Sequence, residues 1–214
     1  MTRETSNARP AGVAAYVLAG GGSTRFGRDK AFVAFAGKPM IQRMIELMRG
    51  ITEKVSVVSS NGKYSNFGAE ILEDRWPGEG PLGGIVTALL HTQKNDPNCN
   101  WNFVVSCDMP FLTSEWMAFL AERAERSTAQ VLLPHSTTGP EPLCACWRTN
   151  SVTTLQPAFE RGVRKVMEGV ALLRAEVLDE RDWKRFDNAG RLFWNMNTLA
   201  DYEEARRILE TGPG

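Results

Sequence analysis

Residues 17–30 read VLAGGGSTRFGRDK, and they are the most informative part of the chain. An apolar run, Val13–Ala19, ends abruptly in three glycines, after which come Arg25 and the pair Asp29-Lys30. Glycines directly after a strand let backbone amides approach an anion closely, because no Cβ stands between the amides and the ligand. Arg25 and Lys30 add positive charge beside those amides. The stretch therefore predicts a strand that opens into a cradle for the phosphates of a nucleotide.

The spacing excludes two common phosphate cradles. Gly22 and Gly27 have the interval of a P-loop, but Arg28 and Asp29 follow where that motif needs Gly-Lys-Ser/Thr. The dinucleotide fingerprint needs a third glycine where Arg25 stands. A glycine-rich turn with a solvated basic side remains an alternative for this stretch alone, and later segments have to separate the two interpretations.

Composition limits the classes of partner. The chain has 214 residues, with 25 basic and 25 acidic side chains and a net charge of zero, so no overall field draws it to nucleic acid or to a membrane. Residues 1–12 are polar at their start and lack the apolar core of a signal peptide, and we expect them to form a disordered lead. Residues 13–210 are then expected to form one domain.

The four cysteines, Cys99, Cys107, Cys144 and Cys146, have no Cys-x-x-Cys spacing, and the chain has only two histidines. A zinc site is therefore not expected. Reduced thiols in a cytoplasmic protein are the simplest interpretation.

Short apolar runs alternate with amphipathic segments along the chain. The expected strands are Val13–Ala19, Lys54–Ser59, Glu70–Leu72, Asn102–Ser106, Gln130–Leu133, Leu143–Trp147 and Ala171–Val177. The expected helices are Met40–Arg49, Gly83–Thr92, Ser114–Arg126, Val152–Arg161, Val163–Glu168 and Leu199–Leu209, with Ser114 and Thr198 near their N-caps. This alternation predicts an α/β fold with a mostly parallel sheet covered on both faces. Ligands bind at the carboxyl ends of such strands, where the glycine loop falls.

A second signal is the run Val104–Pro110, in which a buried strand ends in Asp108. A carboxylate at the carboxyl end of a strand, in the same sheet as a phosphate loop, is well placed to hold Mg²⁺. The alternative is a turn aspartate that caps the next helix. The presence of the glycine loop favours the metal.

Three further segments are ambiguous on their own. Residues 74–85 form a loop rich in proline and glycine, which either recognises a base or packs Trp76 over the edge of the core. Asn195 and Asn197 alternate on an extended segment, which places both amides on one side, but asparagine is also a frequent cap or turn former. The run Gly139–Leu143 leads into a strand and is equally open.

Taken in order, these segments resemble the molybdenum cofactor guanylyltransferases over nearly the whole chain, from residue 13 to about residue 205. The blocks that carry the resemblance are Leu18-Ala19-Gly20-Gly21 with Arg25 and Asp29-Lys30, Gly37-Lys38-Pro39, Asp74 with Gly80-Pro81-Leu82-Gly83-Gly84, Cys107-Asp108-Met109-Pro110, Glu141-Pro142-Leu143, and Asn195-Met196-Asn197-Thr198 with Asp201. The glycine loop and the aspartate strand are shared by the wider nucleotidyltransferase superfamily, whereas the asparagine and Cys-Asp-Met-Pro blocks are narrower.

The resemblance implies a single nucleotidyltransferase domain with a Rossmann-like sheet that uses GTP and Mg²⁺. The terminal phosphate of molybdopterin or Mo-molybdopterin would attack the α-phosphorus of GTP, giving the guanine dinucleotide and pyrophosphate. It also implies contact with other proteins of molybdenum cofactor biosynthesis and with molybdoenzyme chaperones. The implied nucleotide-binding residues are Leu18, Ala19, Gly20, Gly21, Lys30, Asn61, Asp74, Gly80 and Asp108. Lys30, Arg25 and Asp108 would be catalytic, Asp108 would bind Mg²⁺, and Asn195 and Asn197 would lie on the pterin side.

The chain departs from the family pattern at two positions: Phe26 stands where methionine is usual, and Leu199 replaces the proline after the asparagine block. Three alternatives remain open from the sequence. They are a molybdopterin cytidylyltransferase, a sugar-1-phosphate nucleotidyltransferase, and a nucleotide-binding interaction protein without catalysis. Gly20-Gly21 favours guanine over cytosine, and the retention of Lys30 and Asp108 favours an enzyme.

Overall fold

The structure is a computed structural model, and it describes residues 12–20, 29–60, 62–187 and 189–211. Within these residues eight strands form one mixed, mostly parallel sheet in the order β10-β7-β9-β6-β1-β4-β5, and β8 pairs with β7. The strands are β1 Val13–Leu18, β4 Val55–Ser59, β5 Glu70–Glu73, β6 Trp101–Ser106, β7 Val131–Ser136, β8 Gly139–Pro140, β9 Cys144–Arg148 and β10 Ala175–Leu178. The α/β sheet expected from the sequence is confirmed.

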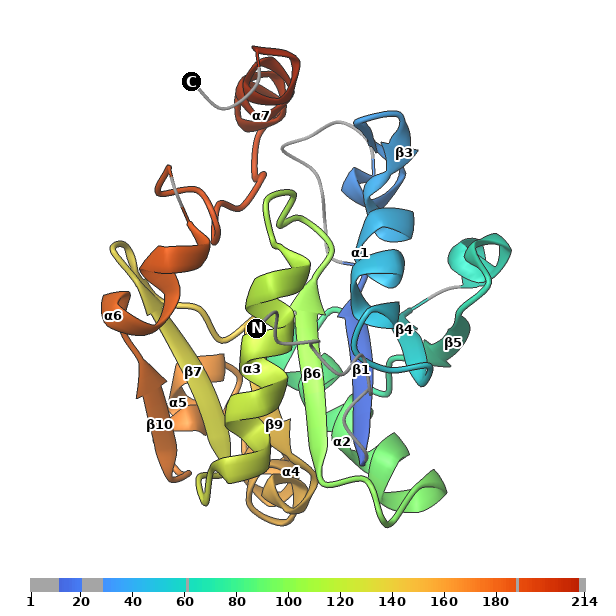
Figure 1. The fold of residues 1–214 in the computed structure, drawn as a ribbon. Coiled ribbons are helices and arrows are strands. Elements are labelled where there is room, and N and C mark those ends of the chain that lie inside the picture. The colour runs from blue at the N-terminus through green and yellow to red at the C-terminus, as the bar shows by residue number, and fades with distance from the viewer. Residues whose placement is uncertain (1–11, 21–28, 61, 188, 212–214) are drawn as a thin grey trace.

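The parallel strands β4, β1 and β6 lie side by side at the centre of the sheet (Figure 1). Leu18 at the end of β1 is paired with Val58 of β4 on one side and with Ser106 of β6 on the other. The carboxyl ends of the three strands therefore lie level with one another. Strand β9 is antiparallel to both of its neighbours, β6 and β7, which interrupts the parallel pattern.

Strand β1 is buried on both faces, because its alternate side chains pack into two hydrophobic cores on opposite faces of the sheet. Val13, Ala15 and Val17 belong to one core, and Ala14 and Tyr16 belong to the other. Helices α1 Met40–Arg49 and α3 Ser114–Arg126 cover the first face, and α2 Pro81–Asn95, α4 Val152–Glu160 and α5 Val166–Val170 cover the second (Figure 1). A continuous apolar run is what such a doubly covered strand requires.

Helix α7 Leu199–Thr211 and the short hairpin of β2 Ala34–Phe35 and β3 Lys38–Pro39 lie at the same end of the molecule (Figure 1). They are joined by the Tyr202 hydroxyl, which donates to the Ala34 carbonyl at 3.0 Å. This end is also where the carboxyl ends of β1 and β6 emerge.

The structure differs from the sequence prediction at several boundaries. Helix α2 begins at Pro81 instead of Gly83, and α5 begins at Val166 instead of Val163. The β2–β3 hairpin, helix α6 Glu180–Trp183, strand β8 and the 3₁₀ helices η1 Lys30–Phe32 and η2 Gly62–Phe67 were not expected. The expected lead lies, apart from Gly12, outside the described residues, so its boundary stays a prediction.

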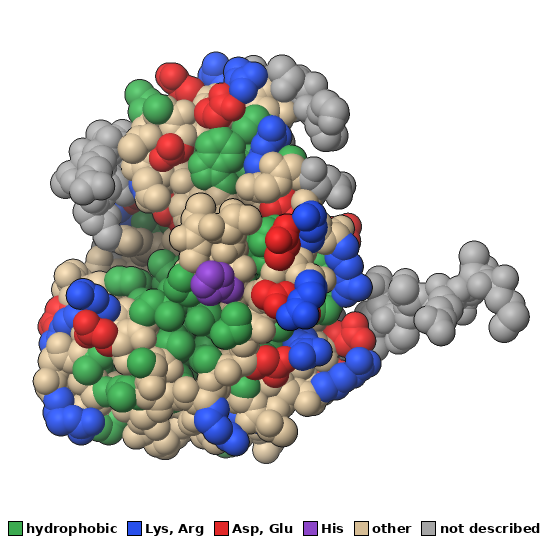
Figure 2. Space-filling view, turned by 90° about the vertical axis from the view of Figure 1, so that its left-hand side faces the viewer, with side chains coloured by type: hydrophobic (Ala, Val, Ile, Leu, Met, Phe, Trp, Pro, Cys, Tyr) green, Lys and Arg blue, Asp and Glu red, His purple; other side chains and the backbone are tan. Residues whose placement is uncertain are grey.

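Acidic and basic side chains are mixed on the one face of the molecule that Figure 2 shows. On the face in Figure 2, acidic and basic side chains lie intermixed around hydrophobic ones, in line with equal numbers of 25 acidic and 25 basic residues. Within the described ranges, no helix is both long enough and apolar enough to cross a membrane.

Candidate functional site

The carboxyl ends of β1 and β6 bring the two strongest sequence motifs together. The Cys107 amide donates to the Leu18 carbonyl at 3.3 Å, so the chain that leaves β6 stays beside the chain that leaves β1. Asp108 lies two residues after the end of β6, and Ala19 and Gly20 directly follow β1. Gly20 has φ +147°, which favours glycine, and a Cβ there would meet no atom within 4 Å.

A pocket of about 460 Å³ opens at this edge of the sheet. It is lined by the ends of β1, β4 and β6, by the loop before α2 and by the start of α2. Its residues are Leu18, Ala19, Gly20, Val58, Ser59, Ser60, Asp74, Gly78, Gly80, Pro81, Gly84, Ser106, Asp108 and Leu143. Six residues that the sequence assigned to the nucleotide lie together here, namely Leu18, Ala19, Gly20, Asp74, Gly80 and Asp108.

Lys30, Asp108 and Asn197 meet beside this pocket. Lys30 Nζ lies 3.6 Å from Asp108 Oδ2 and donates to Asn197 Oδ1 at 3.0 Å. The Lys30 and Asp108 side chains are only 16% and 17% exposed. Their charges therefore face each other in a partly dry environment, where electrostatic interactions are stronger than in bulk water.

The other oxygen of Asp108 is notable because Oδ1 is buried and has no hydrogen-bond partner among the residues that the structure describes. A buried carboxylate oxygen without a donor is costly and calls for an explanation. The alternative that the sequence left open, an aspartate that caps the following helix, is not what the structure has. Helix α3 is capped by Thr113, whose side chain accepts from the Trp116 amide at 3.2 Å.

Asp74 also lines the pocket. Its amide donates to the Ser59 carbonyl at 3.0 Å, and its Oδ1 accepts from the Trp76 amide at 3.1 Å and from Thr87 Oγ1 at 3.3 Å. These bonds fix the Asp74 carboxylate at the start of the loop that leads to α2.

The start of α2 also faces the pocket. Gly80, the N-cap residue, has φ +94°, and no side chain caps the first turn. Free amides at the first turn of a helix attract anions. The next glycines serve packing: a Cβ on Gly84 would lie 3.2 Å from the Leu18 side chain, and one on Gly83 would lie 3.3 Å from Trp76 and Phe159. The groups that approach this helix start closely are thus side chains of the protein itself.

Asn195 and Asn197 contact different neighbours. The side chain of Asn197 contacts Lys30. The side-chain Nδ2 of Asn195 instead donates to the Phe193 carbonyl at 3.2 Å, and Asn195 lines a separate pocket of about 210 Å³. Neither caps α7, because Thr198 and Asp201 do so: Asp201 Oδ2 accepts from the Thr198 amide at 2.7 Å, and Thr198 Oγ1 accepts from the Asp201 amide at 3.2 Å. The capping interpretation of the asparagines is therefore wrong.

The segment that carries the asparagines is attached by its backbone to the loop that follows β6. The Met196 amide donates to the Asp108 carbonyl at 2.9 Å. This bond joins residues 88 positions apart along the chain.

Three sequence-predicted site residues, Arg25, Gly21 and Asn61, lie outside the described residues. Conversely, the structure adds pocket residues that the sequence did not assign to the site, among them Ser59, Ser60, Ser106 and Leu143. The three serines lie at or directly after the carboxyl ends of β4 and β6, so the rule that ligands bind at the carboxyl edge of a parallel sheet could have found them. Leu143 precedes β9, which is antiparallel to β6, so the rule does not apply to it.

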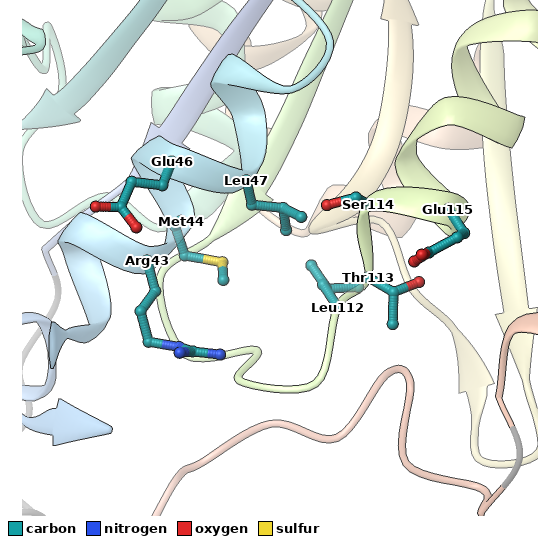
Figure 3. A pocket seen from close by; sticks show the side chains of 8 residues that line it. All are labelled: Arg43, Met44, Glu46, Leu47, Leu112, Thr113, Ser114 and Glu115. Carbon is teal, nitrogen blue, oxygen red and sulfur yellow. The ribbon is translucent and has the colours of Figure 1, made fainter. Parts of the chain in front are cut away.

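A second hollow lies between α1 and the start of α3 (Figure 3). Arg43 and Glu46 come to it from α1, and Thr113 and Glu115 come from the start of α3. It holds no residue of the motifs above, and the Arg43 guanidinium stacks over the Phe35 ring at 5.2 Å. Among the described residues no group of three or more His, Cys, Asp and Glu side chains gathers as a metal cluster.

Comparison with known proteins matches residues 15–177 to the family model of the MobA-like NTP transferase domain. A probable molybdenum cofactor guanylyltransferase of Clostridium perfringens is 30% identical over 193 residues, covering 89% of this chain and 94% of that protein. One of Deinococcus radiodurans is 36% identical over 155 residues, covering 70% and 76% of the two chains. The crystal structure of molybdopterin-guanine dinucleotide biosynthesis protein A from Archaeoglobus fulgidus is 27% identical with a TM-score of 0.80, covering 93% of this chain and all of the other.

Proposed function

This chain belongs to the MobA-like NTP transferase family, and from this premise we propose that it is a molybdenum cofactor guanylyltransferase. The terminal phosphate of molybdopterin or Mo-molybdopterin attacks the α-phosphorus of GTP. The new phosphoanhydride joins GMP to the pterin substrate, and pyrophosphate leaves with the electrons of the broken bond. The observation that carries the proposal is the meeting of Lys30 and Asp108 beside a pocket at the carboxyl edge of the sheet.

The residues suit a reaction that needs no protein nucleophile. The attacking phosphate oxygen is already anionic, so no Ser-His or Cys-His pair has to activate it. Neither histidine lines the pocket: His91 contacts Tyr16 and Glu70, and His135 contacts the Ser136 carbonyl. Catalysis here requires in-line positioning and neutralisation of charge. Lys30 supplies a cation for the phosphates, and Arg25 of the glycine loop is proposed to supply a second.

Mg²⁺ fits the donor set. Mg²⁺ prefers oxygen ligands and is usually held by one or two carboxylates together with substrate phosphates. Asp108 offers a carboxylate whose Oδ1 is buried and has no partner within the described part of the chain, which suits one such ligand. A bound Mg²⁺ would supply charge neutralisation on the phosphates, while Lys30 orients the Asp108 carboxylate from its other oxygen.

The remaining roles are assigned by position in the pocket. We infer that Leu18, Ala19, Gly20 and Gly21 contact the nucleotide with their backbone, and that Gly80 presents the start of α2 to it. Asp74 and Asn61 are proposed to flank the guanosine, since a carboxylate can accept from the N1 and N2 donors of guanine.

Asn195 and Asn197 are proposed to serve the pterin substrate. Asn195 supports this assignment because its pocket carries the aromatic residues Trp183, Phe193 and Trp194, together with hydroxyl side chains of Ser136 and Thr138. A flat heterocycle with hydrogen-bonding edges suits such a mixture of aromatic and polar groups. We further propose that the enzyme works in the cytoplasm, where its four free cysteines stay reduced, and that it exchanges the cofactor with other biosynthesis proteins.

Transfer of label tests the function. The purified protein is incubated with Mg²⁺, molybdopterin and GTP or CTP labelled at the α-phosphate, and both pyrophosphate and labelled dinucleotide are measured. We expect transfer from GTP and not from CTP. Transfer from CTP would indicate a cytidylyltransferase, transfer only to an added sugar 1-phosphate would indicate the sugar enzyme, and nucleotide binding without pyrophosphate would indicate a binding protein.

A further inference from the structure

The side chain of Asp29, directly before Lys30, is held by three groups. Its Oδ1 accepts from the Ala31 amide at 3.0 Å, and its Oδ2 accepts from the Tyr64 hydroxyl at 2.8 Å. Lys63 forms an ion pair with the same Oδ2. Both carboxylate oxygens are thus engaged, one by the turn that contains Lys30 and one by a separate segment of the chain.

That separate segment is η2, which follows the carboxyl end of β4. Tyr64 is fully buried, and its ring stacks on Phe32 of η1 with the centroids 5.3 Å apart. Lys63 lies over the Tyr64 ring at 5.2 Å. The ring contact and the hydroxyl bond therefore attach the turn after the glycine loop to η2, close to the pocket wall at Ser59 and Ser60.

The carboxylate of Asp29 is suited to a fixed anionic role. Burial alone would raise its pKa, but the hydrogen bonds from Lys63, Tyr64 and the Ala31 amide outweigh burial and lower it. A charge-assisted hydrogen bond is about twice as strong as a neutral one. The ionised Asp29 carboxylate therefore joins η1 to η2 by hydrogen bonds that are stronger than those of a neutral side chain.

Resting on the proposed function, we propose that Asp29 and Tyr64 are positioning residues that hold Lys30 in its catalytic place. Lys30 has a long side chain, and arresting the free rotation of such a chain costs conformational entropy. Its ammonium must meet the phosphates while it stays near Asp108 and Asn197. When the backbone on both sides of Lys30 is fixed, fewer positions are open to the ammonium, so less entropy is lost when it binds the phosphates.

Kinetics of three variants test the role. Tyr64→Phe removes only the hydroxyl and keeps the ring, and we expect kcat to fall about tenfold, whereas Asp29→Ala should lower it about 100-fold, since an error of 1 Å in position can cost that much. Affinity for GTP, measured by calorimetry, should change less than about twofold, because most pocket contacts remain. Asp29→Asn keeps an acceptor for the Ala31 amide and should lie between the wild type and Asp29→Ala.

Tyr16→Phe is the matched control. Tyr16 is also a buried tyrosine, and its hydroxyl bonds to Thr92 Oγ1 at 2.6 Å, but it belongs to the core on the other face of the sheet. This variant loses a buried hydroxyl bond as Tyr64→Phe does, so it should lower the melting temperature similarly and leave kcat unchanged. An equal loss of kcat in both variants would overturn the inference.

A double-mutant cycle with Lys30→Ala separates positioning from general damage. In that background there is no ammonium to position, so Tyr64→Phe and Asp29→Ala should change the residual rate less than about twofold. Full additivity of the losses would show that the two residues act independently of Lys30 and would contradict the proposal.

Hydrogen exchange at the Ala31 amide gives a readout that does not need turnover. Exchange should quicken in Tyr64→Phe and Asp29→Ala at this amide while the amides of β1 and β6 keep their protection. If Ala31 exchanges as in the wild type, the two side chains do not order the turn and the inference fails, whatever the activity. If the wild type itself transfers no GMP, the proposed function fails and the exchange result still decides this inference.

Discussion

The two oxygens of the Asp108 carboxylate have different surroundings: Oδ2 faces Lys30, and Oδ1 is buried with no hydrogen-bond donor from residues 12–20, 29–60, 62–187 or 189–211. The exchange of Asp108 for asparagine keeps the shape and removes the charge. We expect Asp108→Asn to lower kcat by about 100-fold or more, comparable to the loss of one key electrostatic group. The Mg²⁺ concentration for half-maximal GTP binding should rise at least about tenfold, since even outer-shell partners of a metal are worth that much. Superimposable Mg²⁺ titrations of variant and wild type would remove Asp108 from the metal site.

The Lys30 ammonium faces the Asp108 carboxylate, with Nζ 3.6 Å from Oδ2. Lys30→Ala should lower the rate of pyrophosphate release by about 100- to 1,000-fold, in line with the loss of one stabilising donor. The far-ultraviolet circular dichroism spectrum should stay that of the wild type, because the ammonium is not part of the core. Pyrophosphate release at a near-normal rate would exclude Lys30 from the mechanism.

Glu141 is a buried carboxyl group. Burial raises its pKa, although hydrogen bonds from Ser136, at 2.7 Å, and from Thr138 oppose the shift. A raised pKa means that the folded protein loses stability as the pH rises from the unfolded value, about 4.3, through the folded value. A glutamine at position 141 would not titrate, so the variant Glu141→Gln should not lose stability in this way.

Urea unfolding of Glu141→Gln at several pH values checks this sign. The variant should gain in free energy of unfolding over the wild type as the pH rises above about 4, by about 1.4 kcal/mol for each unit of pKa shift. The two proteins should differ little near pH 4. A difference that is independent of pH would show that the Glu141 carboxyl has the same pKa in the folded and the unfolded protein.

At the scale of elements, the sequence predicted best the helices whose amphipathic pattern extends over many residues. Helices α1 and α3 begin and end where the sequence predicts, since each has a clear apolar face and polar neighbours. Helix α2 begins two residues earlier than predicted, because Pro81 suits the first turn of a helix and is not a breaker there.

The failures at this scale are short elements that depend on tertiary contacts. The segment from Val163 was predicted to be helical, but Arg164 bonds to the Phe159 carbonyl and stacks on the Phe159 ring at 4.1 Å. Arg164 thus completes the end of α4, after Gly162 with φ +105° has turned the chain. The periodicity of the sequence could not show a side chain folded back on the preceding helix.

The N-terminus of α3 provides a prediction for a single element. The sequence points to the neighbourhood of Ser114, and the structure identifies Thr113 as the cap. Thr113→Ala should cost about 1 kcal/mol of stability because the Trp116 amide loses its acceptor. Ser114→Ala, one residue further, should stay within about 0.5 kcal/mol. Chemical denaturation of the two variants measures the contrast, and equal losses would contradict the assignment of the cap.

At the scale of the whole molecule, the site is assembled from segments that are remote in sequence. Lys30 and Asn197, 167 residues apart, share a hydrogen bond across the carboxyl edge of the sheet. The rule for parallel sheets predicted this edge from the glycine loop and from Asp108. It could not predict which asparagine reaches Lys30, because the path of the chain between α6 and α7 follows from contacts such as the bond of Met196 to Asp108.

Removing both asparagines tests the assignment of this C-terminal segment to the pterin substrate. Asn195→Ala combined with Asn197→Ala should raise the KM for molybdopterin by about tenfold, in line with about 1.4 kcal/mol for two lost hydrogen bonds. The affinity for GTP should stay nearly unchanged, since neither asparagine lines the nucleotide pocket. Of the single variants, Asn197→Ala should also lower kcat, because its Oδ1 holds the Lys30 ammonium, whereas Asn195→Ala should act on KM alone.

Thr198→Ala is the control that separates binding from stability in the same segment. It breaks the reciprocal cap with Asp201, so it should lower the melting temperature by about 2–4 °C and leave the KM for molybdopterin unchanged. The asparagine variants should show the reverse pattern, with a changed KM and a melting temperature close to that of the wild type. If they instead melt several degrees lower with pterin affinity preserved, the asparagines hold the segment in place and the pterin site lies elsewhere.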